Sequence, residues 1–376
     1  MSPMQRTDEC DTGSSRILGK EVSDAAVWAT DPLVSVCIIS YQQAPYIGRA
    51  IEGALAQKTT FPFEIVIGDD ASTDGTCRVA QRYQRDYPDK IRVLTSERNR
   101  GKHWNYQRTE RACRGTYLAY CDADDYWHHP GKLQLQADYL EAHPECGLID
   151  TDGDWFDVTR GTRIKNALAG QRPSSGAAWQ LRDVITSDWI MMSCTVMMRR
   201  AVLEDVLNSC ADDVGGRFPM ADLPRFIEVA VRSGIAHINQ STATYCVFPE
   251  SSCHSRDPVK NLAYYRGGRE LRLRAAARWG GTASREWQQR IVARSTLRLL
   301  RYACQARRSD VARELLQDAA DYEVPVGPVG RLNAYGARCG MGPAVIRALL
   351  LQWAKVRRSV RHVAWVRAIK ERWGIQ

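Results

Sequence analysis

The chain has 376 residues, of which 44% are hydrophobic and 25% are charged, a composition typical of globular proteins. This length exceeds that of one small domain, and no stretch approaches the roughly 18 uninterrupted apolar residues that a membrane-spanning helix needs. The formal net charge is +9, but residues 341–376 hold eight Lys and Arg against one Glu, so the basic excess lies mainly in this last segment.

The first 30 residues and the cysteines indicate the cellular compartment in which the protein is expected. Residues 1–30 show no clear periodicity and lack an apolar segment, which predicts a loose leader rather than a secretory signal peptide. The 12 cysteines occur singly, without a CxxC pair or a metal-finger spacing. This pattern favours a reduced, cytoplasmic protein over a disulfide framework.

Short apolar runs alternate with helical patterns through the first half of the chain. The predicted strands cover residues 32–40, 63–70, 91–95 and part of 115–125. The predicted helices cover residues 44–57, part of 72–88, and 131–145. Such alternation predicts an α/β fold, in which a parallel sheet with right-handed crossovers is flanked by helices.

The second half of the chain has a less regular pattern. Residues 151–180 are polar and rich in Gly, Ser and Arg, which predicts loops or short irregular strands. Residues 188–207 predict a strand that runs into a helix, residues 220–234 a helix, and residues 242–248 a strand. From about residue 259 onward the pattern is helical and rich in Arg.

Two acidic clusters fall where predicted strands end. Asp69 and Asp70 end the second strand, and Asp122, Asp124 and Asp125 end the fourth. In parallel sheets ligands gather beyond the carboxyl ends of the strands. Like charges this close repel one another, so a divalent cation is one natural partner, and the donor groups of a base or ribose are another. A nucleoside diphosphate with its metal would suit both clusters.

Three stretches in this order carry a family resemblance. They are VSVCIISYQQAPYIGRAIEGALAQKTTFPFEIVIGDDASTDGT, ERNRGKHWN and GTYLAYCDADDYWHHPGKLQLQADYL. Over residues 32–150, and more faintly to about residue 258, the chain resembles the nucleotide-sugar domain of family 2 glycosyltransferases. The resemblance implies a GT-A fold, with a Rossmann-like, mainly parallel sheet, here followed by a C-terminal helical extension.

This resemblance suggests a division of the chain. Residues 1–30 would be the leader, and residues 31–258 the GT-A domain. Within that domain, residues 31–150 would form the nucleotide-sugar half and residues 151–258 the acceptor half. Residues 259–376 would form a basic helical region.

The resemblance also implies roles for single residues. Asp124 and Asp125 would hold a divalent metal, Mn²⁺ or Mg²⁺, on the diphosphate of the donor. Asp222, in the segment MADLPRF, would be the catalytic base, although an aspartate is also favoured at a helix N-terminus by the helix dipole. The residues expected to contact the nucleotide sugar are Ser40, Tyr41, Asp69, Asp70, Lys102, Asp122 and Asp124.

The reaction implied by the resemblance is inverting, metal-dependent transfer of a sugar from a nucleotide-diphospho-sugar to a hydroxyl acceptor. The habitual donor of the family suggests a UDP-sugar, with dTDP- and GDP-sugars as alternatives. The acceptor would be a lipid-linked or surface polysaccharide intermediate. A nucleotidyltransferase, a phospho-receiver domain and a non-catalytic sugar-nucleotide-binding scaffold are the rival functions.

The chain departs from the family pattern at several positions. Gln42 stands where Asn is common, and Ala123 stands where Gly is usual. Cys246 and Phe248 replace an Arg and a His of the downstream motif. The candidates to take over the roles of that Arg and that His are Lys102, Arg98, Arg100 and His254.

Other conspicuous residues have plainer interpretations. Tyr126 and Trp127 could stack on a sugar or pack beneath the acidic loop. His128 and His129 are interpreted as solvated loop residues, because adjacent histidines seldom bind one zinc ion. Glu52 is interpreted as an exposed helix charge.

Residues 345–373 form a basic amphipathic pattern with an apolar stripe. Such a helix could lie peripherally on the inner membrane surface or pack on the catalytic domain. Nucleic-acid binding is not expected, because the remainder of the chain is almost neutral and shows no recognisable module.

Overall fold

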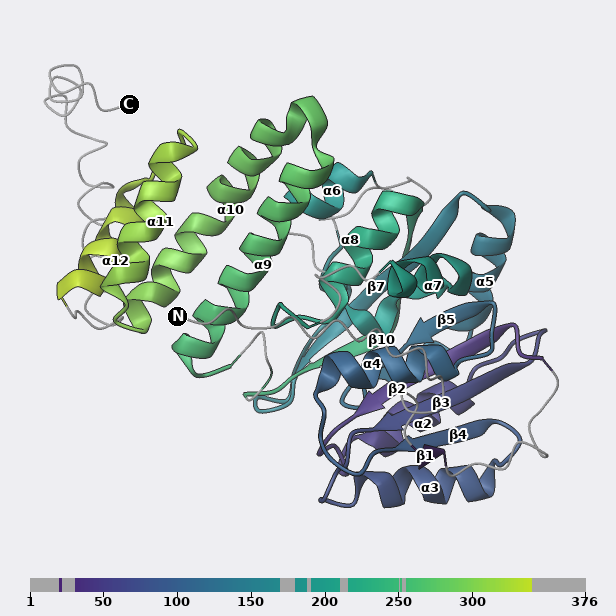
Figure 1. Ribbon diagram of the computed structural model, residues 1–376. Coiled ribbons are helices and arrows are strands. Elements are labelled where there is room, and N and C mark those ends of the chain that lie inside the picture. Colours follow the sequence, from purple (N-terminus) through teal and green to yellow (C-terminus); the bar gives the residue numbers. More distant parts are fainter. Residues whose placement is uncertain are drawn as a thin grey trace, which may run out of the picture. The chain divides into compact units, whose positions relative to one another are not determined.

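A computed structural model describes residues 20–21, 31–169, 180–187, 191–209, 216–249, 251 and 255–339 (Figure 1). The chain divides into two units. The first comprises Met1–Val184 and Trp189–Phe248, and the second comprises Ile185–Asp188 and Pro249–Gln376. Three sets of residues from the sequence analysis lie outside the described residues. They are the expected amphipathic helix at 345–373, His254, and all of the predicted leader except Lys20 and Glu21. The domain boundary expected after residue 258 stays a prediction.

The first unit is built on a ten-stranded sheet in the order β1-β4-β3-β2-β5-β9-β7-β10-β6, with β8 paired to β7. The ladders β2–β3, β3–β4, β2–β5 and β7–β10 are parallel. The strands in these ladders are β2 (Val34–Ser40), β3 (Phe63–Asp69), β4 (Ile91–Thr95), β5 (Tyr117–Tyr120), β7 (Cys146–Asp157) and β10 (Gly234–Val247). Four short strands pair antiparallel, namely β1 (Lys20–Glu21), β6 (Tyr126–Trp127), β8 (Thr162–Ile164) and β9 (Met197–Arg199). The predicted α/β class, with parallel pairing in its long ladders, is confirmed.

Helices connect the strands of this sheet (Figure 1). They are α2 (Ile47–Leu55), α3 (Thr76–Asp86), α4 (Lys102–Ala112), α5 (Lys132–Ala142), α6 (Leu181–Thr186), the 3₁₀ helix η2 (Ser193–Thr195), α7 (Arg200–Asn208) and α8 (Asp222–Arg232). Helix α4 was not located from the sequence, because much of its buried surface is polar. Its buried polar residues are Asn105, Arg108, Thr109 and Glu110.

The sequence does not predict β7, and it predicts only the last part of β10. The segment 151–157, expected to be irregular, continues β7, and β10 begins at Gly234 rather than at residue 242. Both strands carry buried polar side chains, which hides them from a search for apolar runs. His237 Nδ1 and Asp150 Oδ1, for example, are 2.9 Å apart and fully buried. The expected strand within 188–207 is only the three residues of β9.

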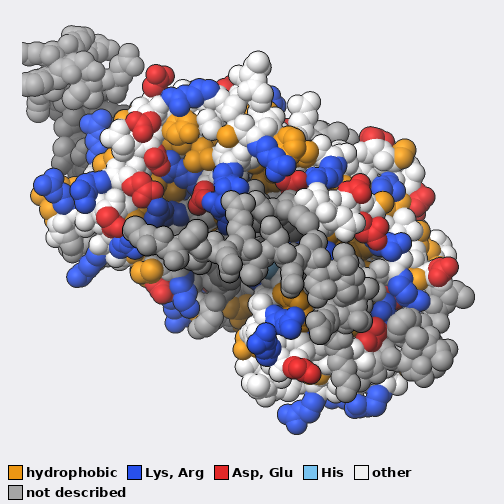
Figure 2. Space-filling view, in the orientation of Figure 1, with side chains coloured by type: hydrophobic (Ala, Val, Ile, Leu, Met, Phe, Trp, Pro, Cys, Tyr) orange, Lys and Arg blue, Asp and Glu red, His pale blue; other side chains and the backbone are white. Residues whose placement is uncertain are grey.

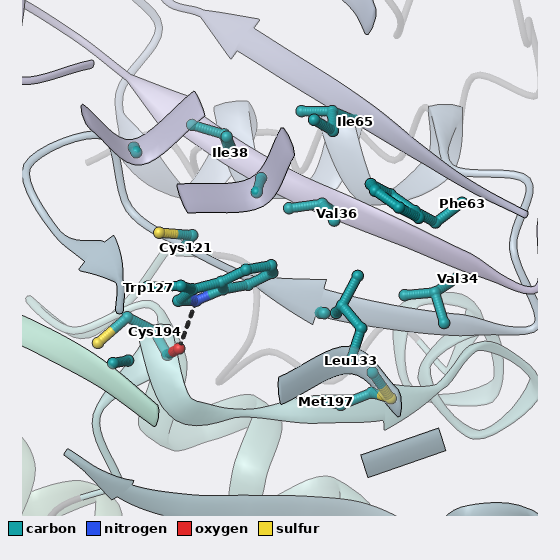
Figure 3. Close-up of a cluster of buried hydrophobic side chains, with 14 of the residues drawn as sticks. Val34, Val36, Ile38, Phe63, Ile65, Cys121, Trp127, Leu133, Cys194 and Met197 are labelled. Carbon is teal, nitrogen blue, oxygen red and sulfur yellow. Dashed lines mark hydrogen bonds between the residues drawn. The ribbon is translucent and has the colours of Figure 1, made fainter. Parts of the chain in front are cut away.

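Apolar side chains of the central strands form the main core of this unit (Figure 3). Val34, Val36 and Ile38 alternate along β2 and are fully buried on one face of the sheet, as the two-residue period of a strand requires. Trp127 packs into the same cluster, and its Nε1 donates to the carbonyl of Cys194 at 2.8 Å. Trp127 therefore packs beneath the acidic loop. The described cysteines are all free thiols.

The second unit is helical, as the predicted C-terminal extension requires. Its elements are α9 (Pro258–Trp279), the 3₁₀ helix η3 (Gly281–Ala283), α10 (Ser284–Gln305), α11 (Ser309–Asp321) and α12 (Pro328–Cys339). Asp257 caps α9 by accepting the N–H of Val259 at 2.8 Å, and Pro258 occupies the first turn. Leu299, Leu300, Val311 and Leu315 lie in the core of this unit.

Basic and acidic side chains are mixed on the described surface that Figure 2 shows. On the face in Figure 2, blue Lys and Arg side chains are interspersed with red Asp and Glu, rather than joined in one basic stripe. Within the described ranges, no helix is long and apolar enough to cross a membrane.

Candidate active site

The strand order marks one place on the sheet for a ligand. β2 pairs with β3 on one side and with β5 on the other, so the order of connection reverses between β2 and β5. A crevice for ligands forms at such a switch point, beyond the carboxyl ends of the strands. The chain after β5 continues beside β2, because the N–H groups of Cys121 and Ala123 donate to the carbonyls of Cys37 and Ile39, both at 3.1 Å. The CDADD segment therefore lies at the switch point.

The three aspartates of this segment have different surroundings. Asp122 accepts hydrogen bonds on both oxygens, from the hydroxyl of Tyr106 and, at 2.7 Å, from that of Ser193. Asp125 Oδ1 accepts the backbone N–H of Cys246 at 2.8 Å. No N–H or O–H group of the described chain donates to Asp125 Oδ2, which is buried with only the weakly donating Cys194 thiol close to the carboxylate. Asp124 is partly exposed.

Burial and neighbouring carboxylates, rather than a nearby cation, have the largest effects on Asp124 and Asp125. Burial, together with the charge of Asp122, raises the pKa of Asp124 to about 7. Burial and the charge of Asp124 raise the pKa of Asp125 well above its usual value. Burial also raises the pKa of Asp122, although Lys102 acts in the opposite direction. A bound cation would relieve the repulsion among the three groups.

The residues present fit a cation of the Mg²⁺ or Mn²⁺ type. No cluster of three or more His, Cys, Asp or Glu side chains in the described ranges could hold a metal alone. Ions of this kind, however, are usually bound by one or two carboxylates and complete their coordination with phosphate oxygens and water. The partly exposed Asp124 and the unsatisfied oxygen of Asp125 match that requirement.

The other acidic pair is held by the chain's own donors. Asp69 is buried and accepts the hydroxyl of Ser40 at 3.2 Å and the N–H of Ser72 at 3.0 Å. Asp70 is also buried and accepts the N–H groups of Arg100 and Gly101, the latter at 2.8 Å. These bonds shape the loops that follow β3 and precede α4. Direct contact of Asp69 and Asp70 with a nucleoside stays a prediction.

Arg108 of α4 supplies the charge that balances this pair. Its side chain is fully buried and donates to the carbonyl of Asp69 at 2.6 Å and to that of Thr95 at 2.8 Å. Burial lowers the pKa of Arg108 to about 10, while the charges of Asp70 and Asp69 act in the opposite direction. Because a partner cation is already present, Asp69 and Asp70 do not need a metal.

The loop after β2 carries further predicted residues. Tyr41 is 45% exposed, whereas Ser40 is buried against Asp69. Gln42 adopts a left-handed backbone conformation, with φ of 57°, and its Oε1 accepts the N–H groups of Thr73 and Asp74 at 3.0 and 3.1 Å. Gln42 therefore bridges the loops that follow β2 and β3.

Asp222 belongs to the same neighbourhood as the acidic loop. It is the first residue of α8, is partly exposed, and accepts the N–H of Leu223 at 2.8 Å. Burial is the main cause that raises the pKa of Asp122 and of Tyr106. The charge of Asp222 is a smaller cause that also raises both pKa values. Lys102 also acts on Asp122. The structure thus brings together Lys102, Asp122 and Asp222, which are far apart in the sequence.

A family model places this site among known proteins. Residues 35–207 match the model described as "Glycosyl transferase family 2". Over these residues, which are less than half of the chain, the chain is similar to that family. The resemblance seen in the sequence is thereby confirmed.

Curated relatives match parts of this chain. An uncharacterized protein of Mycobacterium tuberculosis is 46% identical over 112 residues, which are 30% of this chain and 32% of that protein. Chondroitin synthase of Escherichia coli is 37% identical over 184 residues, which are 48% of this chain and 25% of that protein. The matches therefore span about a third or less of these relatives' own lengths.

Solved structures share the fold. Residues 1–349 of S. aureus TarS in complex with UDP give a TM-score of 0.52 at 16% identity, covering 82% of this chain and 91% of that one. The mannosyltransferase PcManGT from Pyrobaculum calidifontis, in complex with GDP-Man and Mn²⁺, gives a TM-score of 0.52 at 19% identity, covering 96% and 93%. The expected GT-A fold is confirmed.

Two departures from the family pattern have a structural explanation. Ala123 is buried and is not among the described non-glycine residues with positive φ, so an alanine fits there without backbone strain. At Cys246, a guanidinium from another element is present, because Arg49 Nη2 of α2 lies 3.5 Å from the Cys246 sulfur and over the ring of Tyr126. Arg49 is not among the substitutes proposed from the sequence, and one of these, His254, lies outside the described residues.

The remaining conspicuous residues lie at the margin of the site. Glu52 is exposed and accepts the hydroxyl of Tyr83 at 2.6 Å, as its interpretation as a helix charge predicts. His128 is exposed and His129 is half-buried, and each contacts polar groups near β10.

The sequence analysis predicted Lys102 as a site residue, but it missed the other residues that α4 contributes to the site. Tyr106 binds Asp122, and His103 Nε2 lies 2.9 Å from the carbonyl of Phe218, in the segment before α8. The available signal was the four-residue spacing of Lys102, Tyr106 and Glu110, which places them on one face of a helix.

Proposed function

We propose that the protein transfers a sugar from a nucleotide-diphospho-sugar to a hydroxyl acceptor, with inversion at the anomeric carbon. The observation that carries this proposal is the grouping of Asp122, Asp124 and Asp222 near the switch point of a domain similar to family 2 glycosyltransferases. The group combines clustered acids, whose mutual repulsion a cation would relieve, with the partly exposed carboxylate of Asp222 from a separate element. The clustered acids with a bound cation suit a charged diphosphate leaving group. The carboxylate of Asp222 suits the hydroxyl group of an acceptor.

The donor would bind with its diphosphate at the acidic loop. Asp124, with Asp125 beside it, would hold Mn²⁺ or Mg²⁺, which when bound offsets negative charge on the diphosphate. Lys102 is positioned to add a second positive charge near Asp122. The nucleoside would lie toward Ser40, Tyr41 and the loops shaped by Asp69 and Asp70. A UDP-sugar is proposed as the donor, on the precedent of the UDP complex of TarS.

Asp222 would act as the catalytic base. In the proposed step, the acceptor oxygen attacks the anomeric carbon from the face opposite the diphosphate, and Asp222 takes the hydroxyl proton. The bond from that carbon to the diphosphate oxygen breaks, and its electron pair leaves with the phosphate. The transition state resembles an oxocarbenium ion, as in glycoside hydrolysis. One displacement inverts the anomeric centre.

The acceptor would be a glycan under construction. Relatives of the domain include chondroitin synthase of E. coli and a putative teichuronic acid biosynthesis glycosyltransferase of Bacillus subtilis. We therefore propose a surface polysaccharide or its lipid-linked intermediate as the acceptor. A cytoplasmic location and contact of residues 345–373 with the inner membrane stay predictions.

A thermal-shift panel tests donor and metal together. UDP-, dTDP- and GDP-sugars are each added with and without Mn²⁺, and the melting temperature is recorded. One nucleotide class should stabilise the protein by several degrees in Mn²⁺, and the shift should shrink without it, because a ligand that binds only the native state stabilises it. Asp124→Ala should remove the metal-dependent part. No response to any nucleotide would contradict the proposal.

The role of Asp222 is tested on the donor that gives the largest shift. Asp222→Asn should lower nucleotide release by about 10²- to 10⁴-fold, the range of general base catalysis, while the thermal shift with donor stays unchanged. Asp86→Asn, an exposed change at the end of α3, serves as the matched control and should keep full activity. Unchanged turnover in Asp222→Asn would exclude the base assignment.

A further inference from the structure

One buried ion pair joins α4 to α8. Arg225 Nε and Nη2 donate to the two oxygens of Glu110 at 2.9 and 3.2 Å. The side chains are 2% and 0% exposed, respectively. Two parallel bonds between a guanidinium and a carboxylate fix both the distance and the angle between the groups.

The same guanidinium holds the start of α8. Arg225 Nη1 donates to the carbonyl of Ala221, the residue directly before Asp222. Among the residues that the structure describes, no side chain forms a capping hydrogen bond at Ala221. Arg225 is therefore the side chain that fixes the backbone from which Asp222 projects, and Glu110 fixes Arg225.

The pair also contacts the acidic loop through one residue. The guanidinium of Arg225 lies over the ring of Tyr106, 5.2 Å from its centroid, and the hydroxyl of Tyr106 donates to Asp122. Glu110 accepts a further hydrogen bond, from the hydroxyl of Tyr120 on β5 at 3.1 Å. A continuous set of contacts thus runs from Asp122 through α4 to the first turn of α8.

We propose that Arg225 and Glu110 are positioning residues that set the place of Asp222 relative to the acidic loop. This inference rests on the proposed function, in which Asp222 is the base. Both side chains are too buried to touch a substrate, so they act through the backbone at Ala221. A lysine cannot reproduce the geometry, because an ammonium lacks the planar fork that binds Glu110 and Ala221 together.

Three single variants separate positioning from general stability. Arg225→Lys and Glu110→Gln disturb the pair, and Arg92→Lys disturbs the buried pair Arg92–Glu64 on β4 and β3, which serves as the matched control. Arg92 and Glu64 lie near the amino ends of their strands, whereas the site lies at the carboxyl ends of the strands. All three variants should melt at lower temperature than the wild type.

The decisive quantity is turnover per donor-bound, folded molecule, with the folded fraction measured by circular dichroism. Arg225→Lys and Glu110→Gln should lower it roughly 10- to 100-fold, because a misplacement of about 1 Å has an effect of this size. The dissociation constant for the nucleotide sugar should stay within about twofold of the wild type, and Arg92→Lys should keep wild-type turnover. If Arg225→Lys and Glu110→Gln do not fold, Tyr120→Phe provides the test, because it removes one hydrogen bond to Glu110 and keeps the ion pair. This variant should lower turnover by a smaller factor.

A double variant distinguishes this inference from the function on which it rests. If Arg225 acts through Asp222, adding Arg225→Lys to Asp222→Asn should cause no further loss of turnover, since coupled residues are not additive. Full turnover in Asp222→Asn would overturn the proposed base. An inactive Asp222→Asn combined with wild-type turnover in folded Arg225→Lys, Glu110→Gln and Tyr120→Phe would overturn the positioning role alone.

Discussion

At the scale of single residues, the two acidic clusters differ in how their charge is balanced. Asp69 and Asp70 have the buried guanidinium of Arg108 close by and accept bonds from neighbouring donors. In the part of the chain that the structure describes, no guanidinium holds Asp124 and Asp125 in this way, and burial together with neighbouring carboxylates raises their pKa values. The cluster without such a guanidinium is therefore the one suited to a metal and a diphosphate.

A third buried acid allows a test by pH. Glu64 accepts the hydroxyl of Ser35 at 2.6 Å, the N–H of Arg114 at 2.8 Å and Arg92 Nη1 at 3.2 Å. Burial acts to raise the pKa of Glu64, but these donors outweigh it and the pKa lies below the usual value. A carboxylate whose pKa is lowered by folding stabilises the protein above its unfolded pKa of about 4.3, and the contribution is lost as the pH falls through the folded pKa.

We therefore expect Glu64→Gln to lower the free energy of unfolding by about 3–5 kcal/mol near pH 7, because it breaks a buried ion pair. The difference from the wild type should shrink below about pH 4, as the wild-type carboxylate gains a proton. Urea unfolding followed by circular dichroism across this pH range measures both. Glu52→Gln, at an exposed site, should change stability by no more than about 0.5 kcal/mol. A difference that is constant with pH would contradict the account.

At the scale of elements, α4 is the helix that organises the site. It carries Lys102, Tyr106, Arg108 and Glu110, and it lies close against β3. A Cβ atom at Gly68 of β3 would lie 2.1 Å from Thr109 Oγ1 and 2.8 Å from Asn105 Oδ1. The approach of α4 to β3 thus requires glycine at this position.

Gly68→Ala should consequently lower the free energy of unfolding by about 1–3 kcal/mol, the usual effect of overpacking. Gly48→Ala in α2 is the matched control. Its added Cβ would lie 3.4 Å from the hydroxyl of Tyr83, an ordinary contact, and alanine favours a helix interior by up to about 1 kcal/mol. Thermal and urea unfolding of both variants give the comparison. Equal stability of the two variants would show that α4 can shift without loss.

At the scale of the whole molecule, the described site residues all belong to the first unit. The second unit has a core of its own, which contains the fully buried Leu299 and Leu300. Damage to this second core should therefore leave the donor site intact.

Leu299→Ala tests this expectation. The substitution should destabilise the second unit by about 2–5 kcal/mol, as cavities in cores do. The thermal shift caused by a UDP-sugar with Mn²⁺, measured on the transition of the first unit by calorimetry, should equal that of the wild type. Loss of the nucleotide shift in this variant would contradict the assignment of the whole donor site to the first unit.

The sequence by itself determined the α/β class, the family and the acids at the strand ends, because apolar runs, turn residues and carboxylates leave a local pattern. It did not locate α4, the extent of β7 and β10, or Arg108 and the pair Arg225–Glu110. A buried polar side chain resembles an exposed one until its partner is known, and these partners are far apart in the sequence. Only the tertiary structure decided that the buried guanidinium of Arg108 lies close to Asp69 and Asp70 and not to Asp124 and Asp125. The reason is that the charge near each acid depends on which residues from distant parts of the sequence are brought together.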